Sequence, residues 1–150
     1  MSDRPELSLA DREAIRDLRA RFADLANRRQ FDGFSALFSE SGRWAIPDMQ
    51  AQFEGRVAIR GGIEHMLGLW ELFVQFVHDG PIDADGETVT GHSYVQELGR
   101  FVTGGSQYNC AVYDDVYERE DGVWKFASRT YHFLYVDETP LPGRVIPHPA

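Results

Sequence analysis

The chain has 150 residues, a length that fits one domain and is too short for two. Hydrophobic residues make up 43% and charged residues 26% of it, a composition that argues against an intrinsically disordered chain. The formal net charge of −9 argues against nucleic acids and anionic membranes as partners, because the field of the protein repels phosphate groups.

Cys110 is the only cysteine, so an internal disulfide is excluded. The first residues, MSDRPELSLADRE, lack the apolar segment of a secretion signal, and no run of 18 apolar residues follows. We therefore expect a cytoplasmic protein with no membrane partner.

The first half of the sequence has the spacing of amphipathic helices. Ser8 and Asp11 form a helix start, and apolar residues then recur at helical intervals up to about Asn27. A short helix is predicted over 31–38, and a short strand over 43–46. A third helix follows, with one apolar face made by Ile59, Ile63, Met66, Leu67, Trp70 and Phe73.

From residue 73 the hydrophobic period changes from 3.6 to 2, which indicates strands. We predict strands over 73–82, 87–102, 106–119 and 123–136, joined by turns at 83–86, 104–105 and 120–122. Helices followed by a meander of long antiparallel strands indicate an α+β fold, a half-open cone of three helices on a curved sheet. The domain covers 1–136, and 137–150 is a proline-rich, extended tail.

The segment from Tyr113 to Phe126 contains a Tyr-x-Asp motif followed by a hairpin with the motif Asp-Gly-x-Trp-Lys. Together with residues 27–31 and 53–56, this segment resembles the SnoaL-like, nuclear-transport-factor-2-like superfamily, which has a cystatin-like fold. The resemblance covers about 8–136. The layout is most similar to that of the hexachlorocyclohexane dehydrochlorinases and scytalone dehydratases.

The resemblance implies a site without a cofactor. In these relatives an aspartate at the end of the first helix orients a histidine on the strand after the third helix, and the histidine removes a proton from the substrate. The resemblance places Asn27 at the aspartate position and Phe76 at or next to the histidine position, so the pair is absent here. It also places Arg129 where the dehydrochlorinases carry an arginine in the pocket.

Strand parity adds two candidates for acid–base chemistry. His78 shares the strand face of Phe76 and is either a general base or a hydrogen-bonded histidine at a strand end. Glu97 lies in the phase that faces the interior in the relatives, where apolar walls would raise its pKa; the alternative is a solvated carboxylate.

Tyr113 and Arg129 complete the predicted catalytic set, because a tyrosine hydroxyl beside an arginine can polarise a carbonyl group or receive a leaving anion. The tyrosines could equally fill the core. An inward Arg129 needs an anionic partner, for which Asp115 and Glu97 are the candidates. The predicted substrate-binding residues are Asn27, Trp44, Phe76, Asn109, Tyr131 and Phe133.

No metal-ligand spacing and no glycine-rich phosphate loop occurs, so we expect neither metal nor cofactor. The sequence predicts a cofactor-independent lyase or isomerase for a small, largely apolar cyclic or aromatic molecule. A non-catalytic binding module and the small subunit of a ring-hydroxylating dioxygenase stay open as alternatives. We also expect a homodimer or higher homo-oligomer formed through an outer sheet face that carries Tyr94, Leu98, Tyr108, Cys110, Val112 and His132.

Overall fold

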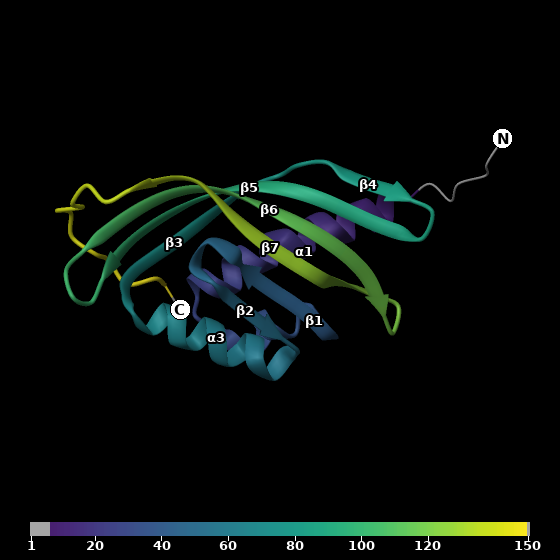
Figure 1. Ribbon diagram of the computed structural model, residues 1–150, viewed down its shortest axis with the longest axis horizontal. Coiled ribbons are helices and arrows are strands. Elements are labelled where there is room, and N and C mark those ends of the chain that lie inside the picture. Colours follow the sequence, from purple (N-terminus) through teal and green to yellow (C-terminus); the bar gives the residue numbers. More distant parts are fainter. Residues whose placement is uncertain (1–6, 150) are drawn as a thin grey trace.

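The computed structural model describes residues 7–149, in which three helices lie on the concave side of one curved sheet (Figure 1). The helices are α1 (Leu9–Asn27), α2 (Phe31–Ser35) and α3 (Arg56–Gly68), and a short 3-10 turn, η1, spans Pro47–Met49. The strands are β1 (Phe38–Ile46), β2 (Ala51–Glu54), β3 (Trp70–His78), β4 (Ile82–Asp85), β5 (Thr88–Phe101), β6 (Ser106–Glu120) and β7 (Val123–Asp137). The predicted α+β class is confirmed.

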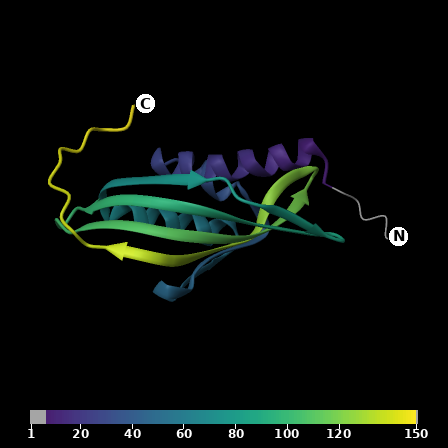
Figure 2. The ribbon, with the colours of Figure 1, turned by 90° about the horizontal axis from the view of Figure 1, so that it is seen from above.

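The sheet has the strand order β2-β1-β7-β6-β5-β3, and β4 pairs with the outer part of β5. Every pairing is antiparallel except that of β1 with β7, which is parallel. The long strands β5, β6 and β7 run side by side along the whole molecule, as the view from above shows (Figure 2). Their bend gives the sheet a hollow inner face.

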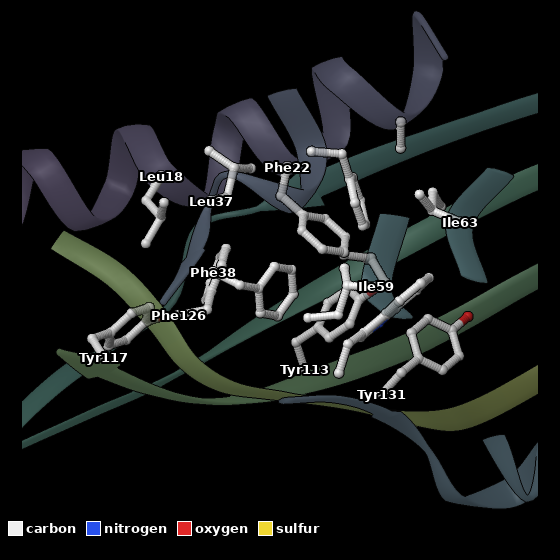
Figure 3. Packing of buried hydrophobic residues seen from close by; sticks show 14 of the residues in the cluster. Leu18, Phe22, Leu37, Phe38, Ile59, Ile63, Tyr113, Tyr117, Phe126 and Tyr131 are labelled. Carbon is white, nitrogen blue, oxygen red and sulfur yellow. The ribbon is translucent and has the colours of Figure 1, made fainter. Parts of the chain in front are cut away.

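Helix α1 begins as the sequence predicts. The Ser8 hydroxyl accepts a hydrogen bond from the backbone N–H of Asp11 at 3.0 Å, and the Asp11 side chain accepts one from the N–H of Ser8, which forms a capping box. Phe22 lies on the buried face of the helix, and its ring centroid is 5.4 Å from that of Tyr113 on β6. Figure 3 shows these rings meeting between helix and sheet.

Several element boundaries differ from the prediction. Helix α3 ends at Gly68, so Trp70 and Phe73, which were predicted on its apolar face, lie on β3, and β1 begins at Phe38 and not at Arg43. Helix α2 ends at Ser35 because Phe38 already pairs with Phe126 as the first residue of β1, and β2 was not predicted. The predicted strand over 73–82 is two strands, separated at Gly80 and Pro81, where a proline cannot donate a ladder hydrogen bond. The backbone of Gly80 lies so close to the His92 carbonyl that a Cβ atom has no room.

Residues 138–149 contain no helix or strand. Arg100 donates hydrogen bonds to the carbonyl oxygens of Leu141 and Gly143 at 3.0 and 2.7 Å, and the Leu141 N–H donates to the Ser106 hydroxyl at 3.1 Å. The tail is thus held against the end of the β5–β6 hairpin. No helix within residues 7–149 is long and apolar enough to cross a membrane.

Candidate active site

A cavity of about 400 Å³ lies between the concave face of the sheet and the helices. Most of its wall is apolar. The contributing side chains come from all three helices, from η1 and from β1, β3, β5, β6 and β7. They include Phe22, Phe34, Trp44, Ile63, Met66, Leu67, Trp70, Phe73, Phe101, Tyr113, Tyr131 and Phe133.

Four polar side chains form one hydrogen-bonded group in the cavity wall, which we call the Glu97 cluster: Gln75, Glu97, Asn109 and Tyr131. The Glu97 carboxylate accepts hydrogen bonds from Gln75 Nε2 at 2.7 Å, Asn109 Nδ2 at 3.3 Å and the Tyr131 hydroxyl at 3.0 Å. Sheet register explains the cluster, because Gln75 and Asn109 lie directly opposite Glu97 on the two neighbouring strands and share its face.

The electrostatics of Glu97 are those of a carboxylate that gains a proton readily. Burial raises the pKa of Glu97, and the hydrogen bonds from Gln75, Asn109 and Tyr131 oppose this rise. These hydrogen-bond partners are all neutral side chains. A carboxylate in such surroundings can accept a proton from a bound molecule and return it.

Tyr113 and Tyr131 reach into the same space from β6 and β7 (Figure 3). Burial raises the pKa of both hydroxyls above the usual tyrosine value, so both stay protonated and can donate hydrogen bonds. For Tyr113, Arg129 opposes the rise.

Three buried polar atoms of the cavity-lining residues have no hydrogen-bond partner within the part of the chain that the structure describes. They are Trp44 Nε1, Gln75 Oε1 and Asn109 Oδ1. The residues that carry them are each 3–5% exposed. Buried polar groups in proteins are nearly always paired, so these three atoms are exceptional.

Arg129 does not line the cavity, which corrects the prediction of an arginine in the pocket. It is fully buried, its Nε lies 3.0 Å from Asp115 Oδ1, and it donates to the Ser93 hydroxyl at 3.0 Å. Its guanidinium carbon lies 3.8 Å from the ring centroid of Tyr113. Of the two predicted anionic partners, the structure selects Asp115 over Glu97.

Phe76 and His78 lie on the outer face of the sheet, and this corrects their predicted place in the cavity. Phe76 is 54% exposed, and His78 Nε2 lies within hydrogen-bond distance of Gln96 Oε1, at 2.8 Å. The residue that faces inward is Gln75, one position earlier, because it pairs with Glu97 while Phe76 pairs with Gln96.

Asn27 is not among the residues that line the cavity, but it holds one that does. Its Nδ2 donates to the Gln75 carbonyl oxygen at 3.0 Å, and its Oδ1 accepts from the Gln75 N–H at 2.8 Å. The last residue of α1 therefore fixes the backbone of β3 where Gln75 points inward. The other predicted residues that line the cavity are Trp44, Glu97, Asn109, Tyr113, Tyr131 and Phe133.

Sequence reasoning missed Gln75, although a signal was present. It is the one polar side chain in the run Leu72-Phe73-Val74-Gln75-Phe76-Val77, and a lone polar residue on a strand next to a buried carboxylate has a reason to face it. Within residues 7–149, no group of three or more His, Cys, Asp or Glu side chains is arranged to hold a metal ion.

A cone of helices and curved sheet around an apolar cavity defines a class of protein, and similarity to known proteins identifies the class. Residues 7–130 match the SnoaL-like domain family, and the chain belongs to this family. The γ-hexachlorocyclohexane dehydrochlorinase of Sphingobium indicum is 32% identical over 144 residues, which cover 90% of this chain and 86% of that protein. Hexachlorocyclohexane dehydrochlorinase 1 of the same species is 30% identical over 144 residues, 90% of this chain and 88% of the relative.

Solved structures agree with this assignment. The crystal structure of LinA superposes with a TM-score of 0.81 at 28% identity and covers 94% of this chain and 96% of that one. The LinA-type3 hexachlorocyclohexane dehydrochlorinase of Novosphingobium barchaimii gives 0.80 at 26% identity, with 94% and 97% covered. A protein of unknown function with a cystatin-like fold from Nostoc punctiforme, 20% identical, gives 0.73 with 91% and 98% covered and supports the fold alone.

Proposed function

We propose that this protein is a cofactor-independent lyase or isomerase for a small, largely apolar cyclic molecule, and that Glu97 is its base. The observation that carries the proposal is a carboxylate set in an apolar cavity wall, with a raised pKa and three neutral hydrogen-bond donors. The membership of the SnoaL-like family and the dehydrochlorinase relatives support the same class of reaction.

In the proposed reaction, the Glu97 carboxylate removes a proton from a carbon atom of the bound molecule. The electron pair of that C–H bond forms a new carbon–carbon double bond, and in a lyase the leaving group departs from the neighbouring carbon with its own bonding pair. In an isomerase the substrate carries a carbonyl group next to that carbon, so the electron pair forms an enolate whose oxygen takes up the negative charge, and the protonated Glu97 then returns the proton to a different carbon. The Tyr113 hydroxyl, which stays protonated, can donate to the negative charge that develops on the substrate.

This assignment moves the base away from the position where the resemblance implied a histidine. Asn27 and Gln75 are amides, and an amide does not accept a proton at neutral pH. The same observation favours the second candidate function, a binding module without catalysis. The two functions differ in one measurable event, the transfer of a proton from carbon.

Exchange of carbon-bound hydrogen tests for that event without knowledge of the leaving group. We expect the protein to speed the exchange of the α-hydrogens of 2-tetralone in D₂O, followed by NMR. Glu97→Gln should slow the exchange about 10²-fold or more, since a general base contributes about 10²–10⁴-fold. Glu118→Gln, at an exposed position, is the matched control and should leave the rate unchanged.

Hexachlorocyclohexane, the substrate that the relatives' names give, is the second substrate of this test, with chloride release as the readout. A protein that binds 2-tetralone but neither exchanges its hydrogens nor releases chloride is a binding module, and that result would overturn the proposed function.

A further inference from the structure

We propose that the ligand of the cavity is an organic cation, an apolar ring system that carries one protonated nitrogen, and that the Glu97 carboxylate is its counter-ion. The nitrogen belongs to a protonated amine or to a protonated C=N bond. This inference names the substrate class of the proposed function and rests on it. It is tested by equilibrium binding, which does not depend on turnover.

The charged side chains in the cavity wall are all of one sign. Among the described residues that line the cavity, Asp48 and Glu97 are the charged ones, and none is an arginine, a lysine or a histidine. The guanidinium of Arg129, which lies against the ring of Tyr113, is already paired with Asp115 at 3.0 Å. Such a wall attracts a cation and repels an anion, and the net charge of −9 acts in the same direction.

The Glu97 carboxylate has room for one more hydrogen bond. Its Oε2 accepts from Asn109 and Tyr131, whereas its Oε1 accepts only from Gln75. Each carboxylate oxygen can accept two hydrogen bonds, so one acceptor position of Oε1 is open within the part of the chain that the structure describes. All three donors are neutral, which leaves the carboxylate without a counter-ion. A ligand cation supplies both the missing donor and the missing charge.

The two amides beside Glu97 add further acceptors. An ionised carboxylate only accepts hydrogen bonds, so Gln75 and Asn109 turn their NH₂ groups toward it. Their oxygen atoms, Gln75 Oε1 and Asn109 Oδ1, are buried and have no donor among residues 7–149. A primary ammonium group has three N–H donors and no acceptor, and Glu97 with these two oxygens offers it three acceptors. A neutral alcohol has one O–H donor for the same three positions.

Aromatic rings surround the same space. The ring of Tyr131 lies beside the carboxylate, since its hydroxyl donates to Glu97 Oε2 at 3.0 Å, and the ring centroid of Phe133 is 4.8 Å from that of Tyr131. The face of an aromatic ring attracts a cation that lies within about 6 Å of the ring centroid, most strongly where water is excluded. The volume of about 400 Å³ leaves room for about two rings behind the nitrogen, given that an apolar cavity of about 150 Å³ holds one benzene.

A cationic substrate also suits the removal of a proton by Glu97. Removing a proton from a neutral molecule creates an anion, and the described cavity wall has no cationic side chain to pair with it. Next to a protonated C=N bond, the electron pair of the broken C–H bond forms a C=C bond, and the π pair of the C=N bond becomes a lone pair on nitrogen. The substrate is then a neutral enamine and Glu97 a neutral carboxylic acid. The step therefore removes both charges from the cavity, where burial disfavours charge.

The test compares 2-aminotetralin with 2-tetralol by isothermal titration calorimetry at pH 7.5. The two compounds have the same rings, but the amine is a cation at this pH, because alkyl amines such as lysine have a pKa of about 10.4. We expect the wild-type protein to bind the amine about tenfold more tightly or better. Equal affinities, or tighter binding of the alcohol, would overturn the inference, and this comparison needs no variant.

Three variants assign the preference to a particular carboxylate. Glu97→Gln removes the charge, keeps the shape of the side chain and should lower the ratio of amine to alcohol affinity at least fivefold. Glu118→Gln makes the same change in net charge at an exposed position and should keep the ratio. Asp48→Asn keeps an acceptor for the N–H of Phe133 and should change the ratio less than Glu97→Gln does, because Asp48 is exposed. A ratio that survives in Glu97→Gln contradicts the role of Glu97 as counter-ion.

Salt separates the cavity from the general field of the chain, which also favours a cation. At about 1 M salt the Debye length is about 3 Å, so charges on the surface no longer act on the ligand. A preference that comes from an ion pair inside the cavity should stay at threefold or more in 1 M salt. A preference that disappears there comes from the net charge of −9 and contradicts the inference.

The outcomes separate the inference from the proposed function. Selective binding of the amine with neither hydrogen exchange on 2-tetralone nor chloride release supports the inference and contradicts the function. Hydrogen exchange or chloride release by a protein without the binding preference supports the function and contradicts the inference.

Discussion

Burial raises the pKa of Glu97, so the folded protein keeps this proton to a higher pH than the unfolded chain does. The stability that this proton contributes is complete below the unfolded pKa and is lost as pH rises through the raised folded pKa. Above that raised pKa the charged carboxylate therefore destabilises the fold. The proton abstraction proposed for Glu97 needs that same charged form.

We expect Glu97→Gln to raise the melting temperature at pH 8, because it replaces a buried charge by an amide. The gain should shrink as pH falls through the raised folded pKa of Glu97 and should be absent below the ordinary glutamate pKa. Each kcal/mol corresponds to about 2–4 °C for a chain of this size. Calorimetry from pH 4 to 8 measures the difference, with Glu118→Gln as control. A variant that melts below the wild type at pH 8 would contradict this prediction.

The buried position of Arg129 indicates that this residue contributes strongly to the stability of the fold. Its guanidinium pairs with buried Asp115 and lies against the rings of Phe22, Tyr113 and Phe126. Removing one partner of a buried ion pair leaves the other charge uncompensated. We therefore expect Arg129→Met to lose about 3–5 kcal/mol of unfolding free energy in urea.

The double variant Arg129→Met/Asp115→Asn should recover part of that loss, since it removes the stranded charge and keeps an acceptor for the Tyr117 hydroxyl. A double-mutant cycle gives the coupling, expected at about 1–3 kcal/mol. Additive losses in the cycle would show that the two side chains do not stabilise each other.

At the scale of elements, the contact between the end of α1 and the middle of β3 holds Gln75 where its side chain faces the cavity. The resemblance placed Asn27 at the aspartate position and Phe76 at or next to the histidine position. In the structure Asn27 hydrogen-bonds the backbone of Gln75, the neighbour of Phe76, and it is Gln75 that faces inward. The double variant Asn27→Asp/Gln75→His puts an aspartate at the end of α1 and a histidine at the inward-facing position of β3.

We expect this double variant to release chloride from hexachlorocyclohexane faster than the wild type does. The matched control is Asn27→Asp/Phe76→His, which puts the imidazole on the outer face and should gain nothing. Ion chromatography of the released chloride measures both. Equal rates for the two double variants would show that the inward place of residue 75 is not what matters.

Strand β3 is the element whose inward face the sequence alone does not predict. Helical period in α1 and alternation in β5, β6 and β7 give the right elements and put Glu97, Asn109, Tyr113 and Tyr131 on the inner face. Strand β3 misleads, because its outward residues Leu72, Val74 and Phe76 are apolar as well and alternation disappears. Only the register against β5 shows which set faces inward.

Unpaired atoms are a further kind of information that a sequence does not contain. Trp44 and Asn109 were expected to bind substrate, but their unpaired N–H and C=O groups depend on where the neighbouring side chains end. The β2 strand and the parallel pairing of β1 with β7 also depend on contacts between distant segments. The local hydrophobic periodicity of the sequence predicts neither the unpaired atoms nor these long-range pairings.

At the scale of the whole molecule, the outer face of the sheet carries large apolar side chains next to solvent. Phe76, Tyr94 and Tyr135, on three different strands, are each 54–55% exposed. We propose that this face pairs with the same face of a second copy, since exposed apolar patches commonly mark interfaces.

Light scattering at micromolar concentration should give at least twice the monomer mass of 17.1 kDa. Tyr94→Glu should lower the mass to that of a monomer, while Val123→Glu, exposed at the β6–β7 hairpin, should not. Salt should strengthen the association, because each copy carries a net charge of −9. A monomeric wild-type protein at high salt would contradict the proposal.

Strand β7 carries a single extra residue in the part of it that lines the cavity. The register slips at Leu134, since Ala111 pairs with Phe133 but Cys110 pairs with Tyr135. Phe133 and Val136 therefore both line the cavity, although simple alternation would send them to opposite faces. An insertion or deletion beyond this bulge would exchange the residues around Val136 and leave Tyr131 and Glu97 in place. The insertion or deletion of one codon would thus change the cavity wall at one end and leave the proposed base in place.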